Sequence, residues 1–342
     1  MRTFCSETHA RHFPRGELSG GELVRPFECP ERWEYVRDAL IARELDDIHA
    51  PGPIDSRALG RIHSPDYLQF LDEAWDAWVA EGFAGDALPT VFPTGVLNRH
   101  EPRHIEGRLG HFSLAAETAI TSGTRAAAYS SAACAASAQQ HVSAGNRVAF
   151  ALCRPPGHHA EAERFGGYCF LNNAALAADG LRQAGAARVA ILDVDFHHGN
   201  GTQSIFYDRE DVFFASLHGD PEDAFPHFWG YAEETGQGAG QGHNANYPMP
   251  PGTDYVAWSA ALDDALERIE DNGTEALVVS LGVDTFERDP ISFFRLKSDD
   301  FTLCGQRIGK TGLPTVFVME GGYAVEEIGI NTTNVLAGFL DA

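Results

Sequence analysis

The chain has few positive charges and no long apolar run. Its 342 residues include 25 Lys and Arg against 49 Asp and Glu, which gives a formal net charge of −24. A chain this acidic repels the phosphate backbone, so we expect no nucleic acid partner. Nowhere do roughly 18 apolar residues follow one another, and residues 1–17 contain no apolar stretch of signal-peptide length. We therefore expect a cytoplasmic protein with no membrane partner.

Paired cysteines and several common catalytic motifs are also missing. The six cysteines include no CxxC pair, which indicates a reducing compartment and argues against a zinc site built from cysteine. There is no GxSxG or HExxH motif, and the glycines within 305–311 are too close together for a phosphate-binding loop. Nucleophilic catalysis by Ser or Cys and nucleotide binding therefore have little support.

The apolar pattern predicts an α/β fold with a mostly parallel sheet. Segments rich in β-branched and aromatic residues predict buried strands at 147–153, 188–194, 212–217, 276–281 and 315–319. Apolar residues at helical spacing predict helices at 173–184, 255–270 and 301–310, and an earlier helix that opens at Ser64-Pro65 and ends near Ala80. This alternation implies helices on both faces of the sheet.

Two stretches break the alternation and are predicted to be long loops, 82–110 and 230–252. Long loops are uncommon in compact domains unless they have a function. The first is a candidate lid or subunit contact, and the second is a candidate rim of a site. For both stretches the alternative is a flexible surface loop without a function. No repeat or linker divides the chain, so we expect residues 1–342 to form a single domain.

Polar residues gather directly after the predicted strands, where open α/β sheets bind their ligands. Asp195 and His197 are two residues apart, so extended backbone points both side chains to the same side. With Asp284 after another strand they supply two carboxylates and one imidazole, which leaves a position open on a catalytic metal. The alternative is a buried ion pair that ties two strands together.

Two histidines and a tyrosine at other strand ends are candidates for the chemistry. His158 and His159 follow a stiff Pro-Pro-Gly turn, and imidazole exchanges protons at neutral pH. Extra metal ligands or turn caps are the alternative. Asp193 and Asn200 are candidates for fixing the orientation of the rings. Tyr323 follows two glycines, so a tight backbone delivers its hydroxyl toward a carbonyl oxygen at the metal, although many such tyrosines only pack.

Three residues outside the strand ends are candidates for a narrow apolar entrance, namely Gly167, Tyr168 and Phe225. Aromatic residues in loops more often fill the core, which is the alternative interpretation.

Four motifs, in this order along the chain, resemble the zinc-dependent histone-deacetylase superfamily, which has the arginase/deacetylase fold: RPPGHH, DVDFHHGNGTQ, LGVDTF and EGGY. Three further stretches are more similar to the bacterial acetylpolyamine amidohydrolases of that superfamily, namely GGELVRPFE, HGDPEDAFPHF and GYAEETGQGAG. The resemblance covers nearly the whole chain.

The resemblance implies a role for each residue that matches a motif. In that interpretation Asp195, His197 and Asp284 bind a catalytic zinc ion, His159 is the general base and acid, His158 is its electrostatic partner, and Tyr323 polarises the carbonyl. Asp193 orients His158. Asn200 departs from the pattern, because many relatives have Asp there, and this weakens the charge support for His159. A structural potassium ion would bind Asp193, Ser216 and Leu217, together with Asp195 and His197.

The function implied is metal-assisted removal of the acetyl group from N-acetylated polyamines or diamines such as acetylputrescine, acetylcadaverine and acetylspermidine. Acids at a tunnel mouth would attract the distal ammonium group, and the candidates are Glu17, Glu106 and Glu117, with solvated surface acids as the alternative. The insertion at 82–110 would help to form a homodimer that narrows the tunnel. A protein or peptide acetyl-lysine deacetylase with the same site is the alternative function.

Overall fold

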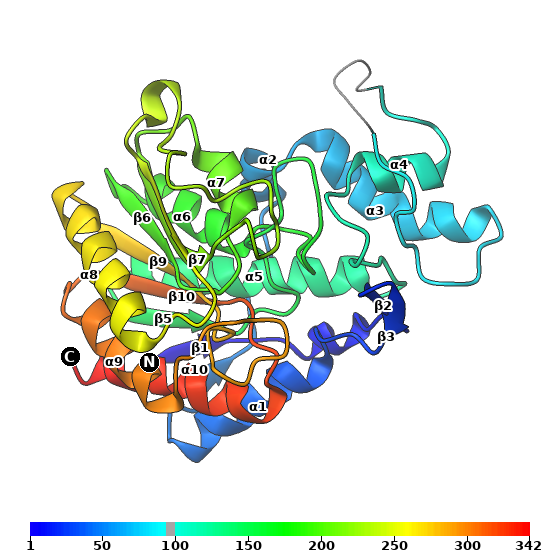
Figure 1. Ribbon diagram of the computed structural model, residues 1–342. Coiled ribbons are helices and arrows are strands. Elements are labelled where there is room, and N and C mark those ends of the chain that lie inside the picture. The colour runs from blue at the N-terminus through cyan, green and yellow to red at the C-terminus, as the bar shows by residue number, and fades with distance from the viewer. Residues whose placement is uncertain (94–99) are drawn as a thin grey trace.

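A parallel sheet forms the centre of the computed structural model, which describes residues 1–93 and 100–342. Its eight strands run in the order β4-β1-β5-β10-β9-β6-β7-β8 (Figure 1). They are β1 (Arg2–Phe4), β4 (Asp47–His49), β5 (Val148–Ala151), β6 (Val189–Asp193), β7 (Val212–Gly219), β8 (Asn244–Met249), β9 (Ala276–Leu281) and β10 (Thr315–Met319). The predicted fold class is confirmed, and each of the five predicted strands is present.

The central strands are apolar along their length because helices cover both faces of the sheet. Every residue of β5, β6, β9 and β10 is buried. Parallel strands in this position need a continuous apolar run rather than an alternating one. The polar residue of β6, Asp193, stands at its carboxyl end. The charged residue of this strand therefore lies at the edge of the sheet where the strands end.

Helices pack on the two faces in two groups (Figure 1). One face carries α5 (Thr124–Ser143) and α6 (Asn173–Gln183), and the other carries α8 (Tyr255–Asp271), α9 (Ser298–Gly309) and α10 (Val325–Leu340), with α1 (Pro30–Ala42) against α10. The other helical segments are η1 (Glu7–Arg11), α2 (Ser56–Ile62), α3 (Pro65–Ala80), α4 (Ile105–His111), α7 (Asn200–Phe206) and η2 (Gly238–Gly240). From β4 to β8 the chain moves across the sheet in one direction, and from β1 to β4 and again after β8 it moves in the other. Right-handed crossovers therefore place the connecting helices on opposite faces.

The N-terminus of α3 forms as the sequence predicts. Ser64 Oγ accepts a hydrogen bond from the N–H of Tyr67, and Pro65 occupies the first turn. This side-chain cap satisfies one of the free N–H groups of the helix, and proline at this position loses no intrahelical bond.

The two predicted long loops are partly wrong, because each contains a regular element. The 82–110 stretch includes α4, while its residues 94–99 lie outside the described residues. The 230–252 stretch includes β8, an edge strand with the sequence NANYPM. An edge strand can be polar and can contain proline, so its sequence does not look like that of a central strand. Strands β1 and β4 have three residues each, too few for an apolar period.

A small antiparallel hairpin stands apart from the main sheet. It consists of β2 (Glu17–Ser19) and β3 (Glu22–Val24), joined by Gly20 and Gly21. The two glycines have φ of 59° and 85°, the left-handed conformation that this two-residue turn needs at both positions. The turn fixes the pairing of the hairpin and with it the place of Glu17. Within the described part of the chain, none of the helices combines the length and the apolar character needed to cross a bilayer.

Candidate active site

Three predicted metal ligands meet at the carboxyl ends of β6 and β9, which are neighbours in the sheet. Candidate ligand atoms of Asp195, His197 and Asp284 all lie within 4.8 Å of one another. His197 Nδ1 is 3.0 Å from Asp284 Oδ2 and 3.3 Å from Asp195 Oδ1. All three residues are buried. We call these three residues the floor triad.

Backbone N–H groups hold both carboxylates of the floor triad. The N–H of Gly321 donates to Asp195 Oδ2 at 2.7 Å, and the N–H of Phe196 donates to Asp284 Oδ1 at 2.7 Å. A Cβ atom at Gly321 would lie 2.5 Å from a carboxylate oxygen of each aspartate, so only glycine fits there. This close approach explains the first glycine of the EGGY motif.

The charges of the floor triad fit a divalent cation. Burial, and then the neighbouring Asp195 carboxylate, raise the pKa of Asp284 to about 8. Burial lowers the pKa of His197, but its hydrogen bonds to both carboxylates raise it more, to about 9. Two buried carboxyl groups and one imidazole, with no arginine or lysine of the described residues hydrogen-bonded to them, are a donor set that zinc and similar ions accept. A bound cation would displace the protons that these raised pKa values favour on Asp284 and His197.

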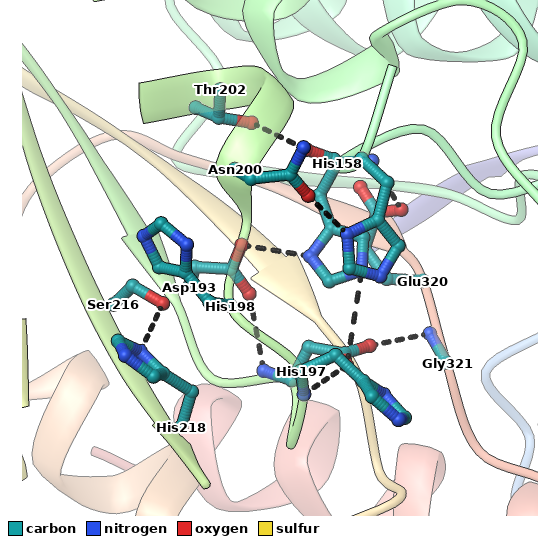
Figure 2. A network of polar contacts seen from close by, with 12 residues as sticks. His158, Asp193, His197, His198, Asn200, Thr202, Ser216, His218, Glu320 and Gly321 are labelled. Carbon is teal, nitrogen blue, oxygen red and sulfur yellow. Dashed lines mark hydrogen bonds and ion pairs between the residues drawn. The ribbon is translucent and has the colours of Figure 1, made fainter. Parts of the chain in front are cut away.

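The two neighbouring histidines lie beside the floor triad on the turn that follows β5. His158 Nδ1 is 3.0 Å from Asp193 Oδ2, and His159 Nδ1 is 2.7 Å from Asn200 Oδ1 (Figure 2). The ring centres of the two histidines are 4.0 Å apart. The structure therefore pairs each histidine with the partner residue that the sequence predicts.

The two histidines have opposite electrostatic surroundings. Burial lowers the pKa of His158, but the Asp195 and Asp193 carboxylates raise it more, to about 10. Burial and the positive charges of His158 and His197 lower the pKa of His159 well below its usual value. At neutral pH His158 is therefore a cation, while His159 is neutral and can accept a proton.

A buried glutamate that the sequence analysis missed holds the turn of these histidines. Glu320 Oε2 accepts hydrogen bonds from the N–H of Gly157 at 2.6 Å and of His158 at 3.1 Å. Glu320 is fully buried, and burial raises its pKa to about 8. A charged residue at the carboxyl end of an apolar strand is a signal that could have identified it.

Tyr323 is positioned by two further residues that the sequence analysis missed. The N–H of Tyr323 donates to Asp289 Oδ2 at 2.7 Å. The Arg32 guanidinium lies 4.8 Å from the centre of the Tyr323 ring and donates to the carbonyls of Gly322 at 2.6 Å and Glu320 at 2.5 Å. Arg32 comes from α1, so its contact with this loop joins residues 288 to 290 positions apart and has no local signal in the sequence.

A cavity of about 510 Å³ leads to this site. Its lining includes His159, His197 and Tyr323, and also the predicted entrance residues Gly167, Tyr168 and Phe225. The Phe225 ring stands perpendicular to the His159 ring at 5.0 Å between ring centres, and the Tyr168 and Tyr323 rings are 5.7 Å apart. Aromatic rings therefore form part of the cavity wall near the candidate proton acceptor. Asp223, His227 and Phe293 also line the cavity and were not predicted.

The structure separates the three predicted substrate acids. Glu17 and Glu117 line the cavity, and Glu106 does not. Glu17 is buried, and its two oxygens accept hydrogen bonds from the Tyr168 hydroxyl and the Phe27 N–H, each at 3.1 Å. Glu117 Oε1 accepts from the N–H of Gly167 at 2.8 Å. Glu106 lies on α4, where its side chain is 47% exposed and 3.6 Å from His104.

The residues predicted to bind potassium lie on neighbouring strands. Asp193 pairs in register with Ser216 across β6 and β7, and Leu217 follows. All three are buried, and Ser216 Oγ is 2.9 Å from His218 Nδ1 (Figure 2). The strands therefore bring this predicted group together, and the N–H of Asp195 donates to Asp193 Oδ1 at 3.2 Å.

The fold and the site define a class of enzyme. The sequence profile of the Histone deacetylase domain matches residues 26–339. The chain therefore belongs to the histone deacetylase family and is an amidohydrolase of the deacetylase type. This family is zinc-dependent, and the floor triad is a group of ligands suited to such an ion. The resemblance found in the sequence motifs is confirmed.

Within this class the chain is similar over its whole length to acetylpolyamine amidohydrolases. It is 55% identical over 338 residues to the acetylpolyamine amidohydrolase of Mycoplana ramosa, with 99% of each chain covered. It is 52% identical over 339 residues to acetylpolyamine amidohydrolase 2 of Pseudomonas aeruginosa, with 99% of this chain and 98% of that one covered. A crystal structure of an acetylpolyamine aminohydrolase from Burkholderia pseudomallei superposes with a TM-score of 0.94 at 38% identity, covering 99% of this chain and 98% of that chain.

Proposed function

We propose that this enzyme removes the acetyl group from N-acetylated polyamines or diamines, such as acetylputrescine, acetylcadaverine and acetylspermidine. The observation that carries the proposal is that two acids, Glu17 and Glu117, line the same cavity as His159 and Tyr323. An acetylated polyamine has an amide at one end and at least one ammonium group further along. Acids in the cavity attract the ammonium group while the amide reaches the floor.

Asp195, His197 and Asp284 would hold a zinc ion, which when bound supplies Lewis-acid polarisation of the amide carbonyl and a lower pKa for a water molecule. His159, neutral because its pKa is depressed, accepts a proton from the attacking water and returns it to the leaving nitrogen. The water oxygen bonds to the acetyl carbon and the carbon–nitrogen bond breaks, which yields acetate and the free amine.

Two further groups stabilise the charge that develops during this reaction. The Tyr323 hydroxyl donates a hydrogen bond to the carbonyl oxygen as it becomes negative. His158 stays protonated beside the site, because the Asp193 and Asp195 carboxylates raise its pKa to about 10, and its positive charge favours the same anion. The two histidines have identical side chains, so their different roles, proton acceptor and fixed positive charge, follow from their surroundings.

The test compares kcat/KM for acetylputrescine, acetylcadaverine, acetylspermidine and an acetyl-lysine peptide, with metal analysis of the same preparation. We expect the acetylated amines to be hydrolysed far more efficiently than the peptide. Equal efficiency on the peptide would instead support the acetyl-lysine deacetylase alternative. His159→Ala and Tyr323→Phe should each lower turnover strongly, and turnover within a factor of two of the wild-type value in either variant would refute the assigned roles.

We also propose that the chain is a single domain, 1–342, that forms a homodimer through the 82–110 insertion and binds a structural potassium ion through Asp193, Ser216 and Leu217. The insertion supports the dimer because Val91, 57% exposed, and Glu106 lie on it at the surface. A dimer that brings Glu106 to the partner's cavity would complete the set of acids. Sedimentation velocity tests the dimer, and activity in potassium compared with sodium tests the ion.

A further inference from the structure

A line of polar contacts leads from His159 away from the cavity to a carboxylate. His159 Nδ1 is 2.7 Å from Asn200 Oδ1, and Asn200 Nδ2 donates to Glu161 Oε1 at 3.5 Å. Asn200 is 2% exposed, and the Glu161 side chain is 14% exposed. Glu161 does not line the cavity, so it cannot touch the substrate there. Among the contacts of the described residues, Asn200 is the residue that links the Glu161 carboxylate to His159.

The orientation of the Asn200 amide decides which nitrogen of His159 carries the proton. The amide has one oxygen that only accepts and one NH₂ group that only donates. With Oδ1 toward His159, the ring proton stays on Nδ1 and Nε2 is free to accept a proton from water. With the amide turned round, the NH₂ group would face Nδ1 and favour a proton on Nε2, which blocks the base.

Glu161 favours the productive orientation through the sign of its charge. Its carboxylate attracts the NH₂ group of Asn200, whereas in the turned amide it would face the Oδ1 atom and repel it. At 3.5 Å the hydrogen bond is long and therefore weak. What favours one orientation is the difference in energy between an attracted NH₂ group and a repelled Oδ1 atom, and not the strength of this bond alone. The other Glu161 oxygen, Oε2, is 3.9 Å from Arg164 Nη1, which leaves Oε1 to Asn200.

The backbone around Glu161 is held by contacts that do not involve its carboxylate. His63 Nδ1 is 3.0 Å from the Glu161 carbonyl, and the N–H of Ser64 donates to the Ala162 carbonyl at 2.9 Å. A change of the Glu161 side chain therefore leaves this loop anchored to the segment before α3.

We propose that Glu161 is a positioning residue that orients the Asn200 amide and thereby keeps His159 in the tautomer with a free Nε2. The inference rests on the proposed function, in which His159 is the proton acceptor. The proposal also explains why orientation matters at position 200. An Asp there has two accepting oxygens, so turning its carboxylate changes nothing. The oxygen and the NH₂ group of an Asn differ, so a neighbouring residue is needed to orient the amide.

The test is a cycle of Glu161→Gln, Asn200→Asp and the double variant, measured as kcat and KM on an acetylated diamine. In the wild-type background, Glu161→Gln should lower kcat about tenfold with KM unchanged, as is typical when a residue behind a catalytic group is lost. In the Asn200→Asp background the same substitution should raise kcat, because it removes a carboxylate that repels the carboxylate introduced at position 200. This reversal of sign is the expected result, and a purely structural role for Glu161 would give the same loss in both backgrounds.

Controls separate failure of this inference from failure of the proposed function. Glu163→Gln removes an equal charge from an exposed position two residues away and should leave kcat within twofold. If His159→Ala keeps its turnover, the proposed function fails. If His159→Ala is inactive but Glu161→Gln has no effect, or has the same effect in both backgrounds, only the inference fails. Should Glu161→Gln fold poorly in thermal melts, Glu161→Ala in the two backgrounds gives the same comparison.

Discussion

The floor and the mouth of the cavity are built in different ways. The floor triad comes from the ends of neighbouring strands, is buried, and has its carboxylates held by backbone N–H groups. The mouth comes from the β2–β3 hairpin and from irregular segments far apart in sequence, and its residues Leu18 and Asp223 are exposed. In the proposed function, the sheet positions the groups that react, and the hairpin and the irregular segments contact the distal part of the substrate. Changes at the floor should affect kcat, and changes at the mouth should affect KM.

The largest expected effect is the loss of a floor ligand. Asp284→Ala should remove the metal and lower kcat/KM by about a thousandfold or more, because the metal contributes several kcal/mol to the transition state. Metal content by plasma mass spectrometry and kcat/KM check this together. Asp271→Ala, an exposed position at the end of α8, is the control for loss of one negative charge. Full metal content with nearly normal activity in Asp284→Ala would contradict the assignment of the floor triad.

Two tyrosines whose ring centres are 5.7 Å apart test the division between the floor and the mouth of the cavity. Tyr323→Phe should lower kcat by about 10² to 10³, the usual cost of losing a donor to the developing oxyanion. Tyr168→Phe removes a hydroxyl that donates to Glu17, and it should raise KM about fivefold with little change in kcat. Steady-state kinetics of the two variants measure both effects. If both variants lost kcat equally, the division between floor and mouth would be wrong.

At the mouth, removal of a single charge should weaken binding of a cationic substrate only. At pH 8 Glu17→Gln should raise KM for acetylputrescine about tenfold, the usual size of a hydrogen-bonded charge contribution, and leave kcat unchanged. N-acetylbutylamine has no ammonium group, so its KM should not respond. An equal rise in KM for both substrates would mean that Glu17 supports the shape of the cavity and not its charge.

The smallest expected effect is the pH dependence of substrate binding. Burial raises the pKa of Glu17 to about 7, although hydrogen bonds from the Phe27 N–H and the Tyr168 hydroxyl oppose this shift and the Glu117 charge adds to it. Above this pKa the carboxylate is charged and attracts the ammonium group, and below it the attraction is lost. KM for acetylputrescine should therefore fall severalfold between about pH 6 and pH 8. In Glu17→Gln this part of the pH profile should disappear.

The sequence predicted the residues that meet at the floor and, apart from Glu106, the residues that it named for the mouth. Asp195 and His197 are only two residues apart, and Asp284 follows a recognisable strand, so the strand ends alone brought the triad together. Of the three predicted substrate acids, Glu17 and Glu117 line the cavity and Glu106 does not. Glu17 is on β2 and Glu106 is on α4, and no local pattern shows how these elements are placed against the sheet. The long loops were predicted only in part, since a polar edge strand and a seven-residue helix have weak apolar patterns.

The sequence by itself determined the α/β fold, the ends of the central strands and the candidate residues for proton exchange and metal binding. These follow from local patterns, namely continuous apolar runs and polar residues two apart where a strand ends. Only the tertiary structure decided that Arg32 and Asp289 hold Tyr323, that Glu320 holds the histidine turn, and that Glu161 stands behind Asn200. These contacts join residues far apart in the chain, and Glu320 at the end of β10 binds the turn that follows the neighbouring strand β5. Their energy depends on burial and geometry, which no local pattern of amino acids encodes.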